Sequence, residues 1–224
     1  MSAHLTEEEQ IEAFKRWWKD NGTNTLAVIV IAIAGYFGWQ GWQANKQAQK
    51  EGASAMYQQL SDIADTGLDL SESQLVEVAT LGEQIKEQYK SSQYAINAAL
   101  VLAKYAVADN NLDEAKKQLQ WADRHTEDPA TKAVISQRIA RLAIAQGQLD
   151  EALDLVSSAP LEEFTSAFAE VKGDALAAKG ESSKAYDAYQ EALASLPSEQ
   201  GNRRQFLEMK RDQYATEQSL VEAK

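Results

Sequence analysis

The feature that most constrains this chain is a run of 25 residues without a charged side chain, from Asn21 to Asn45. The rest of the chain is highly polar, since Asp, Glu, Lys and Arg make up 25% of its 224 residues. An apolar run of this length is a membrane span, a cleaved signal peptide or a buried core helix. Which of these three the run is determines the cellular compartment of the residues that follow it.

The signal-peptide alternative rests on "AIA" at residues 32–34, which resembles a small-x-small cleavage site. However, the region before it is long and contains the acidic residues Glu7, Glu8 and Glu9, whereas signal peptides begin with a short basic region. The apolar character also continues beyond the site, as far as Trp42. A core helix rarely runs so far without a charged edge. Both alternatives are therefore disfavoured.

Four of the five Trp residues lie at the two ends of this run, with Trp17 and Trp18 just before it and Trp39 and Trp42 near its C-terminal end. Trp18 and Trp39 would lie roughly 31 Å apart along a helix, which is close to the thickness of a bilayer's hydrocarbon core. Tryptophan side chains concentrate at the two interfaces of a membrane. The sequence therefore predicts a retained transmembrane helix at residues 25–43.

The basic residues beside the span favour a cytoplasmic N-terminus, because cytoplasmic flanks carry more Lys and Arg. These residues are Lys15, Arg16 and Lys19 before the span and Lys46 and Lys50 after it. Residues 1–24 would then form a short cytoplasmic segment, and residues 44–224 a domain on the other side of the membrane.

The segment at residues 1–24 is predicted to be an amphipathic helix, with Ile11, Phe14 and Trp18 on one face and Gly22 as its stop. Its apolar face suits either the inner membrane surface or a cytoplasmic partner.

Within the span, Ala34, Gly38 and Gly41 share one helical face, and small residues let another membrane helix approach closely. Glycine and alanine are also simply common in membrane helices, so this contact is a hypothesis.

Beyond the span the composition predicts an all-α fold, since the chain has only 3 Pro and many strong helix formers. The net charge of −12 argues against nucleic acid as a partner. The chain has no Cys, only 2 His, and no nucleophile, metal or nucleotide motif. We therefore expect no enzyme, no metal and no cofactor.

Three segments of the polar region align with one another: "ADNNLDEAKKQLQWA", "AQGQLDEALDLVSSA" and "AKGESSKAYDAYQEA". Their turn residues, Asn110, Gly147 and Gly180, are spaced by 37 and 33 residues, near the roughly 34 of a tetratricopeptide repeat. In each, an alanine follows five positions after the turn residue and another seven positions later; these are Ala115 and Ala122, Ala152 and Ala159, and Ala185 and Ala192. A tetratricopeptide-type α-solenoid is therefore predicted, in which stacked helix pairs share a continuous core.

Small residues are expected where the paired helices cross, at Ala103, Ala140 and Gly173. Residues 52–90 are predicted to form a divergent first unit. Residues 201–218 are predicted to form a closing helix with Phe206 and Met209 directed inward.

In such a solenoid the first helix of each pair lines a concave face, and that face is the candidate groove for an extended polypeptide. The candidate groove residues are Asn97, Leu100 and Lys104, then Gln137, Arg141 and Ile144, then Glu170 and Asp174. Lys104 and Arg141 would make one end basic, and Glu170 and Asp174 would make the other acidic. The alternative is that these are ordinary solvated positions.

Nearly the whole chain resembles the bacterial YfgM family of ancillary subunits of the SecYEG translocon. The most specific match is "EQIEAFKRWWKDNG" (residues 9–22), followed by a span ending in "GWQGW"; "FLEMKRDQY" resembles the family's closing helix. The resemblance implies a single-span inner-membrane protein with a periplasmic tetratricopeptide domain. It also implies partners, namely SecYEG and a membrane-anchored periplasmic foldase of the PpiD type, and a role in helping newly exported, unfolded chains.

Two hypotheses follow. The first is a non-enzymatic, chaperone-like translocon adaptor. The second is a membrane-tethered scaffold or regulator that signals through its cytoplasmic tail to a stress-response regulator, which the resemblance also suggests.

Overall fold

The computed structural model describes residues 7–197 and 200–222, and within these residues the chain forms helices and turns but no strand. The predicted all-α fold is therefore confirmed. The chain divides into two compact units, Met1–Gly52 and Ala53–Lys224. The domain boundaries expected from sequence, after residues 24 and 43, stay predictions.

The first unit belongs to a single long helix, α1 (Glu7–Ala64), whose residues 53–64 lie in the second unit. α1 is long and apolar enough to cross a membrane. Its large apolar side chains, such as Leu26, Ile31 and Phe37, are exposed, as lipid-facing side chains must be. The Trp residues that flank the span are exposed too, and the Lys46 ammonium lies 4.5 Å from the ring centre of Trp42. This arrangement suits a membrane interface.

Gly22 does not end the first helix, which corrects the sequence prediction. A glycine ends a helix when it adopts the left-handed conformation, and Gly22 is not among the described glycines with positive φ. Its neighbours support the helix, because the side chains of Asn21 and Thr25 donate hydrogen bonds to the carbonyls of Trp17 and Asn21. The Trp18 ring also covers Gly22, so the glycine is packed rather than free.

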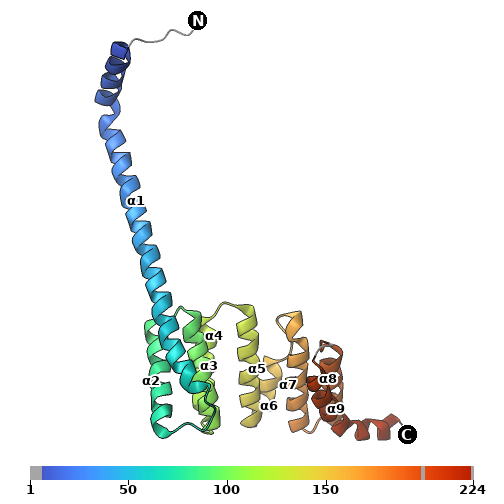
Figure 1. Cartoon of the computed structure of the whole chain (residues 1–224). Coiled ribbons are helices and arrows are strands. Elements are labelled where there is room, and N and C mark those ends of the chain that lie inside the picture. Colours follow the sequence, from blue (N-terminus) through green and yellow to red (C-terminus); the bar gives the residue numbers. More distant parts are fainter. Residues whose placement is uncertain (1–6, 198–199, 223–224) are drawn as a thin grey trace. The chain divides into compact units, whose positions relative to one another are not determined.

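The second unit is a succession of antiparallel helices that follow one another in chain order (Figure 1). α2 packs on α3, and the pairs α3 and α4, α5 and α6, and α7 and α8 contact each other before α9 closes the series. Their bounds are α2 Glu72–Gln88, α3 Gln93–Ala108, α4 Leu112–His125, α5 Pro129–Ala145, α6 Leu149–Leu155, α7 Thr165–Ala178, α8 Ser182–Ala194 and α9 Gly201–Glu222, with a short 3₁₀ turn at Glu162–Phe164.

The same turn joins the two helices of three successive pairs. Asn110, Gly147 and Gly180 have φ of 57°, 73° and 79°, the left-handed conformation that ends a helix. In each turn the next residue donates its N–H to a carbonyl five residues back, at 2.8, 2.8 and 2.9 Å. This geometric repetition confirms the predicted tetratricopeptide-type repeats.

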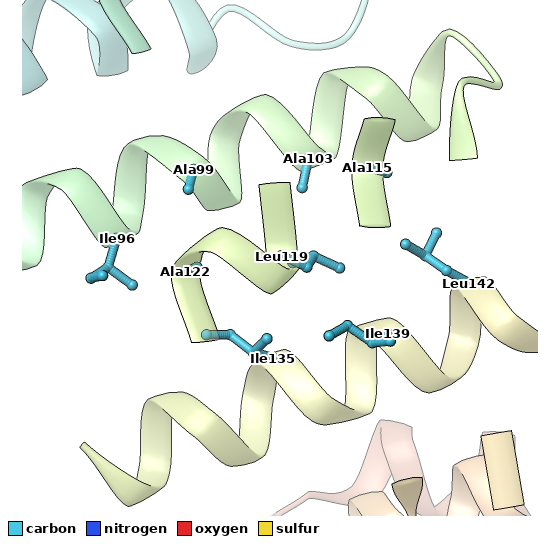
Figure 2. Packing of buried hydrophobic residues seen from close by; sticks show 9 residues of the cluster. All are labelled: Ile96, Ala99, Ala103, Ala115, Leu119, Ala122, Ile135, Ile139 and Leu142. Carbon is cyan, nitrogen blue, oxygen red and sulfur yellow. The ribbon is translucent and has the colours of Figure 1, made fainter. Parts of the chain in front are cut away.

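Figure 2 shows how small residues let the helices approach each other. Ala99 and Ala103 of α3 face Ala115 and Leu119 of α4, and α5 closes the cluster from the other side. The full set of buried residues is Ile96, Ala99, Ala103, Ala115, Leu119, Ala122, Ile135, Ile139 and Leu142. A helix of the first pair thus shares its core with the second pair, as a solenoid requires.

The second repeat departs from the predicted alanine register. α6 ends at Leu155, so Ala159 lies beyond the helix and is only partly buried, whereas Ala122 and Ala192 are fully buried. Pro160 explains the difference, because a proline disfavours helical backbone in the residue before it.

α9 buries a different face from the one expected. Phe206 and Met209 are 47% and 62% exposed, while Leu207 is fully buried against α8 and its neighbours. The inward stripe continues through Lys210 and the partly buried Tyr214, at helical spacing from Leu207. Lys210 belongs there because α7 presents acidic partners to it, described below.

Gly173 lies where α7 packs closely against α8. A Cβ built at this position would lie 2.6 Å from the Cε1 atom of Tyr189 in α8. The Tyr189 ring has little freedom to move, because it is buried and its hydroxyl donates a 2.8 Å hydrogen bond to Asp174.

We therefore expect Gly173→Ala to lower the free energy of unfolding by about 1–2 kcal/mol. Overpacking costs about 1–3 kcal/mol, and the better helix propensity of alanine returns up to about 1 kcal/mol. Gly201→Ala in α9 is the matched control, since a Cβ there meets nothing within 4 Å. Thermal unfolding followed by circular dichroism would measure both; equal effects of the two substitutions would contradict the packing argument.

Candidate peptide-binding pocket

An open pocket of about 700 Å³ lies between α3 and α5 in the second unit. Its floor includes Ala103, Leu119 and Leu142, which belong to the buried cluster of Figure 2. Most of its lining is apolar, as in typical ligand sites. The lining residues are Tyr57, Leu68, Asn97, Leu100, Val101, Ala103, Lys104, Val107, Ala108, Leu112, Leu119, Arg138, Arg141, Leu142 and Ala145.

Three cations stand in this apolar lining, Lys104 on α3 and Arg138 and Arg141 on α5. The Lys104 ammonium is 3.3 Å from the Ala64 carbonyl and 5.1 Å from the ring centre of Tyr105. The Tyr105 hydroxyl in turn donates to the carbonyls of Ala64 and Gly67. These contacts tie α3 to the end of α1 and hold Lys104 in place.

Arg138 and Arg141 are three residues apart and so lie on the same face of α5. Burial lowers the pKa of the Arg138 guanidinium, and the positive charge of Arg141 lowers it further. In the part of the chain that the structure describes, no ion pair involves Lys104, Arg138 or Arg141. Among the described residues no acidic side chain lines the pocket. Burial, followed by the negative charge of Asp65, raises the pKa of Tyr57 in the lining.

Four of the sequence-predicted groove residues line this pocket: Asn97, Leu100, Lys104 and Arg141. Two others do not. Ile144 packs against a neighbouring core cluster, and the buried amide nitrogen of Gln137 has no hydrogen-bond partner among the described residues. Their role in binding stays a prediction.

Glu170 and Asp174 lie at a different place, in an ion-pair cluster with α9. Glu170 is 5% exposed and pairs with Arg203 and, at 3.0 Å, with Lys210. Asp174 pairs with Lys210 at 2.7 Å and accepts the hydroxyl hydrogen bond of Tyr189. These carboxylates are already neutralised within the chain, so they attach the last helix and add no acidic end to the pocket.

Arg138, Tyr57 and Leu68 also line the pocket, and the sequence pattern did not predict them. Tyr57 and Leu68 come from the divergent first unit, where no repeat register points to them. Arg138 could have been found, because the spacing of "RIAR" places two guanidiniums on one helical face.

The environment of Tyr189 predicts a loss of stability at high pH. Burial, followed by the negative charge of Asp174, raises the pKa of its hydroxyl above the ordinary value. The folded state therefore favours the neutral phenol, and its contribution is complete below the unfolded-state pKa of about 10 and is lost as the pH rises further. We expect the free energy of unfolding to fall more steeply above pH 10 in the native chain than in Tyr189→Phe, measured by denaturant titration at each pH. Parallel pH profiles of the two proteins would exclude Tyr189 as the cause.

The candidate membrane contact lies in the first unit, on α1. Ala34 is exposed, and a Cβ at Gly38 or Gly41 would meet nothing within 4 Å. This face is thus uncovered within the unit, and its contact with another membrane helix stays a prediction.

As for metals, the described residues contain no group of three or more His, Asp or Glu side chains that could hold one.

These features define a class of protein: a tetratricopeptide-type solenoid with an open, apolar pocket, on a chain with one candidate membrane span near its N-terminus. Residues 15–216 match the tetratricopeptide repeat-like domain family.

The chain is also similar to three proteins that are each named ancillary SecYEG translocon subunit. That of Aggregatibacter actinomycetemcomitans is 31% identical over 86% of this chain and 91% of the relative. That of Escherichia coli K12 is 29% identical over 87% and 91%, and that of Haemophilus influenzae is 28% identical over 87% and 92%. This chain belongs to the family of ancillary SecYEG translocon subunits, which confirms the resemblance found in the sequence.

Proposed function

We propose that this protein is an ancillary subunit of the SecYEG translocon in the bacterial inner membrane. It acts with a PpiD-type periplasmic foldase as a non-enzymatic, chaperone-like adaptor for newly exported proteins. The observation that carries this proposal is the similarity to translocon subunits over 86–87% of this chain and 91–92% of each relative, together with the family match over residues 15–216, which include the span and most of the solenoid.

In this proposal the span at residues 25–43 anchors the protein beside the channel, with the N-terminus in the cytoplasm and the solenoid in the periplasm. The exposed apolar surface of α1 supports the anchor. The small-residue face at Ala34, Gly38 and Gly41 is available for a channel or foldase helix. The pocket between α3 and α5 receives emerging polypeptide.

Site-specific photo-crosslinking in living cells tests the proposal. A photo-reactive residue at Gly38 fits without strain, because that position has open space around it; Tyr36 at a similar depth on the opposite face is its control. A second photo-reactive residue at Arg141 probes the pocket, with the exposed Lys184 of α8 as control. We expect channel or foldase adducts from Gly38 and exported chains from Arg141, and few from the controls. Absence of all three adducts would refute the adaptor.

Single cysteines test the orientation, since the chain has none of its own. A membrane-impermeant maleimide added to spheroplasts is expected to label Lys172→Cys in the solenoid. It should label Glu8→Cys near the N-terminus only after the membrane is broken. The reverse pattern would invert the topology and place the pocket in the cytoplasm.

Deleting residues 2–14 separates the adaptor from the tethered regulator, and it keeps Lys15, Arg16 and Lys19, which favour the cytoplasmic orientation of the N-terminus. An adaptor keeps its effect on export without this segment, because its pocket and span remain. A regulator that signals through its tail loses its phenotype. The assay compares export of a secretory reporter with the output of the envelope stress response in the same cells.

A further inference from the structure

The pocket between α3 and α5 is basic in a strongly acidic protein. The chain has a net charge of −12, yet the cations in this lining are Lys104, Arg138 and Arg141, and no acidic side chain among the described residues lines the pocket with them. Elsewhere in the solenoid lysines such as Lys116 and Lys179 have acidic partners within 3 Å. Charges on a partly desolvated, apolar surface are costly without a counter-charge. The three cations of the lining therefore lack a counter-charge, and a negatively charged ligand would supply one.

The arrangement of the cations suits an extended ligand. Lys104 approaches from α3 and the two arginines from α5, so the cations flank an apolar floor of leucine, valine and alanine. A volume of about 700 Å³ has room for several side chains of a peptide. The amide of Asn97, also in the lining, can pair with peptide main-chain groups.

We propose that this pocket selects polypeptide segments in which acidic and apolar side chains alternate. The inference rests on the proposed function, in which the pocket receives unfolded chains, and adds the chemical class of segment that it prefers. Side-chain carboxylates pair with Arg138, Arg141 and Lys104, and the intervening apolar side chains contact the floor. Guanidiniums bind carboxylates in bidentate geometry, which makes the arginine pair the centre of selection.

Peptide binding to the full-length protein in phosphatidylcholine nanodiscs tests the inference, with empty nanodiscs as blank. Three labelled octapeptides, acetylated and amidated at their ends, alternate Leu with Glu, Gln or Lys. We expect the Leu/Glu peptide to bind about tenfold or more tightly than the Leu/Gln peptide, and its affinity to fall with added salt. The Leu/Lys peptide should bind weakest.

Two double variants identify the cause. Arg138→Gln with Arg141→Gln should abolish the preference for Leu/Glu over Leu/Gln, and an unchanged circular dichroism spectrum and thermal midpoint show that the variant is folded. Lys117→Gln with Lys184→Gln removes the same charge from exposed positions and should keep the preference. Equal binding of Leu/Glu and Leu/Gln by the native protein would overturn the acidic selectivity but leave a polypeptide groove. Binding of none of the peptides would refute the groove as well.

Discussion

Replacing both Arg203 and Lys210 by methionine is expected to lower the free energy of unfolding by about 3 kcal/mol, because it leaves the buried Glu170 carboxylate unpaired. This is the lower end of the range for a broken buried ion pair, since water can enter where the long side chains are shortened. Asp174 loses the same lysine but keeps its hydrogen bond from Tyr189.

A third substitution tests this explanation. Adding Glu170→Met to the double variant removes the unpaired charge, and we expect most of the lost stability to return, because apolar groups often replace a buried ion pair without loss. Lys117→Met is the control for charge removal at an exposed pair and should cost no more than about 1 kcal/mol. Failure of the triple variant to recover would mean that the cations stabilise α9 by packing alone.

Leu119→Ala is expected to destabilise the solenoid by about 2–5 kcal/mol. Leu119 is 2% exposed and stands between α3 and α5 in the cluster of Figure 2, so its removal opens a cavity shared by two repeats. The matched control is Leu75→Ala in α2, which is 41% exposed and should cost less than about 1 kcal/mol. Urea unfolding of both variants supplies the comparison, and similar midpoints would show that Leu119 is not part of a cooperative core.

The repeats were predictable because their signals are local. A left-handed turn requires glycine or asparagine, and Asn110, Gly147 and Gly180 stand at that place in each pair. A close helix crossing requires alanine or glycine, which explains Ala115 and Gly173. Each rule acts within one repeat, so a single sequence reveals it.

The closing helix was harder to predict because its buried face depends on a partner 30 or more residues away. Hydrophobicity alone selects Phe206 and Met209, the largest apolar residues near its start, yet both are exposed. Lys210 faces inward only because α7 carries Glu170 and Asp174. The same ion pairs explain why Glu170 and Asp174 lie away from the pocket, although their positions in the repeat had assigned them to the groove.

The pocket was predicted in part for a similar reason. The helical positions that face inward in a regular repeat selected Asn97, Leu100, Lys104 and Arg141, which line the pocket, and their role in binding stays a prediction. Leu68 lies in a connecting segment between α1 and α2, which has no counterpart in the other repeats. The contribution of such a residue to the pocket is evident only from the three-dimensional arrangement of the helices.

The attachment of α9 by ion pairs has a consequence for how this architecture changes during evolution. The helices of the internal pairs meet at small residues and are joined by the same left-handed turn, so these junctions resemble one another. The last junction is not interchangeable, because α9 matches the carboxylates of α7 specifically. We therefore expect that a helix pair inserted between internal repeats is tolerated, whereas one inserted after α8 separates α9 from its partners on α7.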